Sequence, residues 1–409
     1  MTRFIGEHVK ISTVLRAMVL AGMLPIATNS FAAEIGGVEF SGSGFMTLAV
    51  GQMLGGTNRN VMDYNCPCFI SDYAQAAVYD NRSGLQWQPD SKLGVQGTAL
   101  FAERSFSVTA QAVSRGTANG GADLEWLYGS YKVNEQFTIQ AGRKRLPMFY
   151  YSDTQDIGVA LPWIHLPPGP YGWEAVNYNG INVAYQSQFK EWTTSANMLA
   201  GSESNSNSGY QKIYYGRQSV SNIQWDNIFG GNLTLSNDWL ETRVVYIQSN
   251  TQEYNSSGGW NSTTQAYDIA PAVIYPRASQ QIYGLSVNSD YNNWLLRTEF
   301  LTIIHPGLGY RDYAHLIGIG YHYGKWQPMI TGSEYIGRMI TDGLIPPATP
   351  TPENMQQTIS LTVRYDLTTS SDLKIQYDSQ TDISSPAYQA TGYDYGNSQL
   401  VTLAYDVVF

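Results

Sequence analysis

The sequence is poor in charged residues, in cysteine and in long apolar runs, and each deficit excludes a class of protein. Charged residues make up 14% of the 409 residues, against about a quarter in an ordinary soluble domain, so much of the surface is not expected to face water. Beyond residue 32 there is no run of about 18 apolar residues, which excludes a helical membrane protein. What remains is a β-protein that places its apolar residues at every second position.

Cysteine and histidine are too scarce and too scattered to suggest a metal site. The only cysteines are Cys66 and Cys68, whereas a zinc or iron–sulfur site needs about four ligands at characteristic spacings. No metal and no cofactor are therefore expected. In an oxidising compartment the two thiols can form a local disulfide that pins a loop, although a one-residue gap strains such a bridge. Redox chemistry is the less favoured alternative.

The N-terminus has the three parts of a secretory signal peptide. Basic residues precede an apolar run over 17–27, which is shorter than a bilayer requires. Small side chains at Ser30 and Ala32 suit a cleavage site, so we expect 1–32 to be removed and 33–409 to form the mature domain. Loss of three basic residues and one acidic residue takes the formal net charge from −10 to −12, which argues against nucleic acid as a partner.

Apolar residues alternate with polar ones along the mature chain, the pattern of a strand with one apolar face. The C-terminus shows it best, because one face carries Val401, Leu403, Tyr405, Val407 and Phe409 and the other carries Thr402, Ala404 and Asp406. The same alternation occurs at 106–112, 240–246, 294–300, 359–366 and 373–378.

Both faces of these strands need a partner, and no helical segments remain to cover the apolar one. A closed barrel in a bilayer satisfies both, because lipid meets the apolar face, water in the lumen meets the polar face, and closure leaves no unpaired edge. The fold class is therefore predicted to be all-β, a transmembrane antiparallel β-barrel.

The expected strands number about sixteen, an even count, as in bacterial single-chain barrels. Short turns alternate with long connections, and short turns are periplasmic in such barrels. With both termini periplasmic, the long connection over 55–91, which holds the two cysteines, is extracellular. The expected strands are 37–54, 92–103, 105–115, 122–134, 136–144, 177–187, 192–201, 222–236, 238–250, 279–290, 292–304, 311–324, 326–338, 356–367, 371–381 and 397–409.

The terminal Phe409 with its alternating run, the strand count and the long connection after the fifth strand resemble the Gram-negative trimeric porins, the general diffusion channels of bacterial outer membranes. This resemblance implies an integral outer-membrane protein, a homotrimer in contact with lipid and lipopolysaccharide, and passive diffusion of ions and small hydrophilic solutes. It also implies that Phe409 marks the last strand for the outer-membrane assembly machinery. In that family the loop after strand five folds into the barrel and narrows the pore, and here it corresponds to 145–176.

Charges are expected to face one another across this constriction. The loop contributes Asp153, Asp156 and Glu174, and a transverse field between them and a basic wall would orient polar solutes. Strict alternation along the strand points Arg145 toward lipid. For Arg145 to face the lumen, the strand has to end or twist before this residue. Any single basic residue can instead simply pair with a neighbouring acid, as Arg364 could with Asp366, and select no solute. We weight this interpretation equally with a role in selectivity. The expected basic residues of the lumen are Lys144, Arg145, Arg243, Arg297, Arg364 and Lys374.

No enzyme is expected, because the chain has neither a Gly-x-Ser-x-Gly elbow nor a His-Glu-x-x-His motif. Two alternatives to a general channel stay open. A substrate-selective outer-membrane channel is favoured by the four prolines between 162 and 170. A secreted or surface β-protein that binds carbohydrate through the loops at 201–208 and 255–264 is less favoured, because outward positions of the best strands are almost free of charge.

Overall fold

The computed structural model describes residues 31–82, 84–101, 105–118, 120–255, 259–261, 263–267, 273–274, 276–306, 309–339 and 353–409. Residues 1–30, which make up most of the expected signal peptide, lie outside the described residues. None of the helices in the described part of the chain is long and apolar enough to cross a bilayer.

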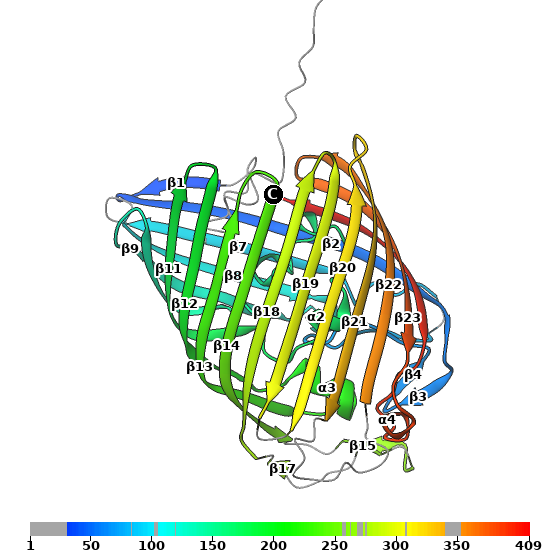
Figure 1. Cartoon of the computed structure of the whole chain (residues 1–409). Helices are drawn as coiled ribbons and strands as arrows, with labels where there is room; N and C mark the ends of the chain where they lie inside the picture. Colours follow the sequence, from blue (N-terminus) through cyan, green and yellow to red (C-terminus); the bar gives the residue numbers. More distant parts are fainter. Residues whose placement is uncertain are drawn as a thin grey trace, which may run out of the picture.

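Sixteen long antiparallel strands close into one barrel, as predicted. Each strand pairs with the next in chain order, and the last pairs with the first. In Figure 1 the strands follow one another around the tilted wall. They are β2 (Val38–Gly56), β7 (Lys92–Phe101), β8 (Phe106–Arg115), β9 (Ala122–Lys132), β10 (Phe137–Arg145), β11 (Asn177–Phe189), β12 (Trp192–Asn205), β13 (Ser221–Ser236), β14 (Leu240–Asn255), β18 (Ala278–Tyr291), β19 (Trp294–His305), β20 (Tyr310–Tyr321), β21 (Trp326–Met339), β22 (Glu353–Thr368), β23 (Ser371–Asp382) and β24 (Ser398–Val408).

The seam of the barrel lies between β2 and β24. Their register starts at Phe45 opposite Val408. Phe409 extends the ladder by donating its N–H to the carbonyl of Gly44 at 2.9 Å and accepting the N–H of Gly44 at 2.6 Å. A Cβ on Gly44 would lie 2.5 Å from the Phe409 ring, so a larger residue there would displace the ring from this position. Beyond Phe409 the same edge of β2 is covered by the short strand β1 (Phe31–Ile35).

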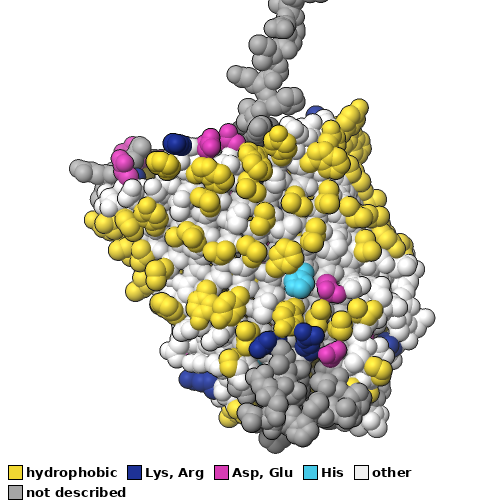
Figure 2. Space-filling model, in the orientation of Figure 1, with side chains coloured by type: hydrophobic (Ala, Val, Ile, Leu, Met, Phe, Trp, Pro, Cys, Tyr) yellow, Lys and Arg dark blue, Asp and Glu magenta, His cyan; other side chains and the backbone are white. Residues whose placement is uncertain are grey.

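The outside of the barrel is an apolar band, because outward positions carry the apolar half of each alternation. Ile330 of β21 lies between Ile319 and Leu361 on the neighbouring strands, and all three side chains are about half exposed. Figure 2 shows such apolar side chains across one face of the wall. Aromatic pairs such as Trp326 and Tyr365, with ring centroids 4.6 Å apart, occupy one end of the strands, as at a lipid headgroup boundary.

Several connections pack together into a small folded unit, here called the cap, made of 59–79, 209–215 and Tyr395. Its buried side chains include Tyr64, Ile70, Ile213 and Tyr395, and a Cys66–Cys68 disulfide lies among them. Its elements are β3 (Arg59–Val61), β4 (Tyr64–Cys66), β5 (Phe69–Asp72), β6 (Ala77–Tyr79) and α3 (Gly209–Tyr215). Other short elements of the connections are α4 (Pro386–Gln389), β15 (Trp260–Asn261), β16 (Ala266–Tyr267) and β17 (Val273–Ile274).

A charge placed in the middle of the apolar band should destabilise the barrel in lipid. We expect Ile330→Lys to lower the free energy of unfolding in lipid vesicles by about 2–4 kcal/mol. The matched control is Gln188→Lys at an exposed strand end, which should change it by about 0.5 kcal/mol or less. Urea titrations in vesicles measure both values, and equal effects of the two substitutions would contradict an outward-facing Ile330.

Candidate functional site

The connection between β10 and β11, residues 146–176, lies inside the barrel and is here called the inner loop. It contains η3 (Ser152–Thr154), η4 (Gly158–Ala160) and α2 (Pro168–Tyr171). Trp163 is fully buried and donates its Nε1–H to Thr331 Oγ1 of β21 at 2.9 Å. The backbone N–H of Ile164 donates to Gln376 Oε1 of β23 at 2.8 Å. The inner loop therefore reaches the wall opposite the strand from which it starts.

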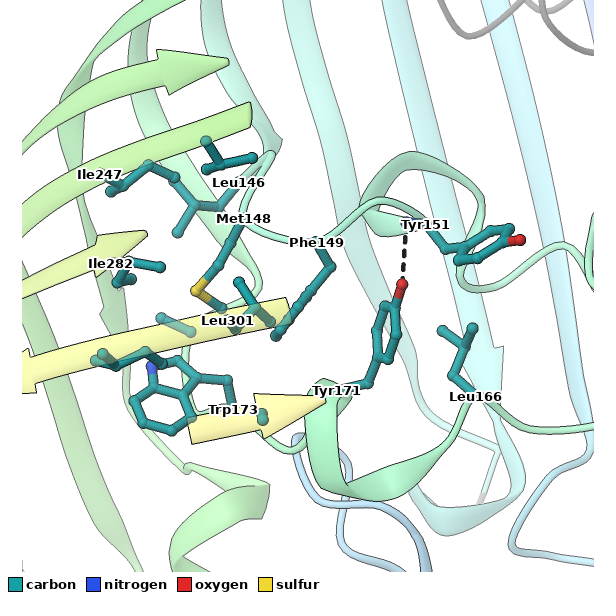
Figure 3. Packing of buried hydrophobic residues seen from close by; sticks show 14 of the residues in the cluster. Leu146, Met148, Phe149, Tyr151, Leu166, Tyr171, Trp173, Ile247, Ile282 and Leu301 are labelled. Carbon is teal, nitrogen blue, oxygen red and sulfur yellow. Dashed lines mark hydrogen bonds between the residues drawn. The ribbon is translucent and has the colours of Figure 1, made fainter. Parts of the chain in front are cut away.

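An apolar core holds the ends of the inner loop against β14, β18 and β19. In Figure 3 Met148 and Trp173 of the loop lie beside Ile282 and Leu301 of the wall. The loop also closes on itself, because the Tyr151 N–H donates to the Tyr171 hydroxyl at 3.2 Å (Figure 3). These inward wall positions are apolar because the loop, rather than water, covers them.

Three basic side chains of the wall hold the inner loop by its backbone. Arg364 donates to the carbonyls of Val159 at 2.7 Å and Leu161 at 3.2 Å. Lys374 donates to the Gly158 carbonyl at 2.7 Å. Arg243 donates to the carbonyls of Pro147 at 2.9 Å and Tyr150 at 3.3 Å. Cations at these positions bind carbonyls of the irregular loop backbone that have no partner in a strand ladder.

At Arg243, Arg364 and Lys374 the structure thus has contacts to carbonyls of the loop, where charges of the loop carboxylates were expected to face them. Arg364 pairs with Asp366 at 2.7 Å, which is the simple pairing considered from the sequence. Arg297 pairs with Asp290 at 2.6 Å. The loop packs so closely on this wall that its carbonyls, and not its acids, reach the bases.

A buried histidine joins three parts of the molecule. His165 of the inner loop contacts Asp90, at the end of the β6–β7 connection, through Nδ1 at 2.9 Å, and Asp378 of β23 through Nε2 at 3.1 Å. Burial would lower the pKa of His165, but the two carboxylates outweigh burial and raise the pKa to about 10. The imidazolium is therefore charged at neutral pH and donates from both ring nitrogens. The Phe69 ring of the cap lies 5.3 Å from it.

The acid of the inner loop that meets arginines is Asp156. It pairs with Arg115 of β8 at 2.8 Å and with Arg145 of β10, and Lys92 lies 3.9 Å away. Glu125 of β9 pairs with the same two arginines, at 2.6 Å and 3.1 Å. Burial would raise the pKa of Asp156, but Arg115 and Arg145 outweigh it and hold the pKa well below its usual range.

The alternation of β10 holds through Lys144, which contacts the inward-facing Gln140 and Tyr128. Gly142 has φ of 135°, and a Cβ there would lie 2.2 Å from the carbonyl oxygen of Leu127, so only glycine fits. The departure comes at the last residue of the strand, Arg145, whose side chain joins the buried cluster and is 3% exposed. Strict parity would have pointed it at lipid.

The remaining predicted charges lie apart from the Asp156 cluster. Lys144 lies over the Tyr128 ring at 4.9 Å and interacts electrostatically with Asp153. Glu174 accepts hydrogen bonds from Trp225 Nε1 at 2.8 Å and from Thr251 Oγ1 at 3.2 Å. Burial raises the pKa of Glu174.

Sequence reasoning missed Arg115, Lys92, Glu125 and Asp90. A signal existed for Arg115, because it continues the inward face of Ser107, Thr109 and Gln111 on the same strand. Its partner could not be found in this way, because Asp156 lies 41 residues further along an irregular loop.

Water-accessible space remains on both sides of the inner loop. A cavity of about 1350 Å³ lies between the cap and the ends of β9, β10 and β12. It adjoins a cavity of about 50 Å³ lined by Asp72, Arg115 and Asp156, because the two share Gln75, Pro89 and Val176. A third cavity, of about 160 Å³, is lined by Tyr150, Arg297 and Arg364. Within the described residues no three His, Cys, Asp or Glu side chains are placed to hold a metal ion.

Solved structures similar to this chain include bacterial outer-membrane proteins. The chain is similar to outer-membrane expressed OmpT of Vibrio cholerae, with a TM-score of 0.55, 8% identity, and coverage of 93% of this chain and 100% of that one. It has the porin fold. An anion-selective porin from Comamonas acidovorans gives a TM-score of 0.54 at 12% identity, covering 91% of this chain and 100% of that one.

Salmonella typhi OmpF, solved in complex with daunomycin, gives a TM-score of 0.55 at 11% identity, covering 93% of this chain and 100% of the porin. At such low identity the likeness establishes the fold. No family model matches the sequence, and no curated protein matches it.

The His165 contacts should make stability depend on pH in the alkaline range. Because the pKa of His165 is raised on folding, its contribution is fully present below its ordinary pKa, about 6.5, and is lost as the pH rises through about 10. Replacing it with glutamine at pH 7 leaves two buried carboxylates without a cation and should cost about 3–5 kcal/mol.

Thermal unfolding of wild type and His165→Gln at pH 7 and pH 10.5 measures this effect. The difference in melting temperature between wild type and His165→Gln should be smaller at pH 10.5 than at pH 7. His315→Gln is the control, because His315 is a third exposed on the outer wall and lies 3.9 Å from Glu334. A His165 effect that is the same at both pH values would contradict a charged imidazole.

Proposed function

We propose that this protein is an outer-membrane porin, a water-filled channel for passive diffusion of ions and small hydrophilic solutes. The observation that carries the proposal is a closed barrel with an apolar outside whose lumen holds an inner loop fixed at Gly158, Val159 and His165 while cavities stay open beside it. Such an arrangement narrows a passage without filling it. Diffusion through it involves no covalent step, so we propose no enzymatic activity.

The inner loop is the proposed constriction, and the charges that act there are those of the Asp156 cluster. Arg115 and Arg145 on the wall face Asp156 on the loop. These groups are in direct contact, so a polar solute passes beside the ion-paired cluster and experiences the field that its charges set up. The sequence predicted a field across the constriction between loop carboxylates and basic residues of the wall. The basic residues that we now propose for this field are Arg115, Arg145 and Lys92.

The cap favours a selective channel over a general one. Its own apolar core and its disulfide hold a fixed shape at the mouth of the barrel, so a solute enters through the space beside it. A mouth of fixed shape can discriminate among solutes in a way that an open one cannot.

We propose a homotrimer whose contacts lie on the outer face of β7 and β8. Small side chains face one another there across the ladder, with Gly97 opposite Ala110 and Ala99 opposite Val108. Small residues let two membrane proteins approach closely. Phe409, which ends the seam with β2, is the proposed signal for the assembly machinery, and the rest of the apolar band is proposed to contact lipid and lipopolysaccharide.

Electrical recording from the purified protein in a planar bilayer tests the proposed function. Insertion should produce discrete steps of current, and vesicles that contain the protein should swell in small sugars faster than in large ones. A protein that inserts into vesicles and neither conducts nor admits any solute would contradict the proposal.

Asp156→Asn should shift ion selectivity toward anions. The substitution removes the loop carboxylate that contacts Arg115 and Arg145 and lies near Lys92, so the local balance of charge becomes more positive. Reversal potentials in a salt gradient measure the change. Asp123→Asn is the matched control, because Asp123 is 61% exposed and lies 3.5 Å from Arg115, so its charge is screened by solvent. A larger shift for the control would refute the assignment.

A further inference from the structure

The large cavity beside the cap has features of a binding site as well as of an entrance. We propose that it binds neutral polyhydroxylated solutes, that is, saccharides, before they reach the constriction. This inference rests on the proposed channel function and names the solute class that the channel takes.

The cavity lies beside the cap, next to the Asp156 cluster. It has a volume of about 1350 Å³ and lies between the cap, the segment 85–89 and the ends of β9, β10 and β12. Ligand sites for small molecules commonly occupy about 300–1,000 Å³, so a saccharide fits here together with water. The narrow cavity at Asp156 adjoins it, and a solute held here is presented directly to that passage.

The charges of the lining are balanced in number, and six of the eight have an ion-pair partner in the lining or just behind it. Four basic and four acidic side chains line the cavity. Arg143 pairs with Glu203 at 2.8 Å, and Arg217 pairs with Asp80 at 2.6 Å. A charged solute would have to break such pairs to gain a partner, whereas a neutral one leaves them intact. The electrostatics therefore favour an uncharged ligand.

Uncharged amides supply the hydrogen bonds that such a ligand needs. Gln75, Gln88, Asn205 and Asn207 line the cavity, and Gln88 and Asn207 are exposed. An amide carries donors and an acceptor side by side, as does a pair of neighbouring sugar hydroxyls. Within the described part of the chain the side chains of Gln88 and Asn207 make no hydrogen bond of their own, so they are available to a ligand.

Trp87 supplies an apolar face inside this polar cavity. Its side chain is 57% exposed, and Leu85 beside it in the lining is 60% exposed. The ring of Tyr64, which also lines the cavity, is already covered by the Arg217 guanidinium at 4.2 Å. An indole face packs against the C–H face of a pyranose ring, which a small ion or an acyclic zwitterion does not offer. Trp87 is therefore the proposed stacking platform.

The test measures how sugars block the ion current of the full chain in a planar bilayer. Maltotriose added to the extracellular side should reduce the current in a saturable way, whereas triglycine and citrate at the same concentration should not. Trp87→Ala should raise the half-blocking concentration of maltotriose about tenfold or more, and Trp87→Phe should raise it less. Trp239→Ala, a half-exposed tryptophan in the turn that follows β13, should leave the block unchanged.

A second measurement separates failure of this inference from failure of the channel. Titration of maltotriose into the detergent-solubilised protein, followed by calorimetry, reports binding whether or not the protein conducts. Current without a saturable block, block by triglycine or citrate as strong as by maltotriose, or a Trp87→Ala variant that binds as wild type does would each overturn the saccharide site. Absence of any current with normal maltotriose binding would instead overturn the proposed channel.

Discussion

Every backbone N–H and C=O that meets lipid must be hydrogen-bonded within the protein, and the rest of the structure depends on this constraint. The chain meets it by closing sixteen strands into a ring, so that no strand edge faces the hydrocarbon. Closure happens at one seam, where β24 and Phe409 pair with β2. Once the ring is closed, the alternation of each strand sends apolar side chains outward and polar ones into the lumen.

Charged side chains can then be placed in the lumen. Most of those described here hold the irregular inner loop in position. Arg243, Arg364 and Lys374 bind carbonyls of the inner loop, and His165 ties that loop to β23 and to the end of the β6–β7 connection. Such cations stabilise backbone groups that no strand partner can reach. The functional consequence is a passage whose walls hold one shape while solutes move through it.

The strands were predictable from the sequence and the contacts of the loops were not. Two-residue periodicity is a local property, so each of the sixteen strands was found within a few residues of its observed bounds. The loop carbonyls that Arg364 binds and the Asp378 partner of His165 lie more than 200 residues away in sequence, and no local pattern encodes such pairs. Periodicity also failed at Arg145, the last residue of β10, where the strand gives way to the inner loop and the side chain is buried in the Asp156 cluster.

Hydrogen exchange of the seam amides in lipid vesicles tests the central claim most directly. If β2 and β24 close the barrel, the amides of Phe45–Gly56 and Ser398–Val408 should exchange as slowly as those of β13 and β14, which pair far from the seam. Fast exchange along both seam strands, with the other strands protected, would show an open sheet and would contradict the closed barrel.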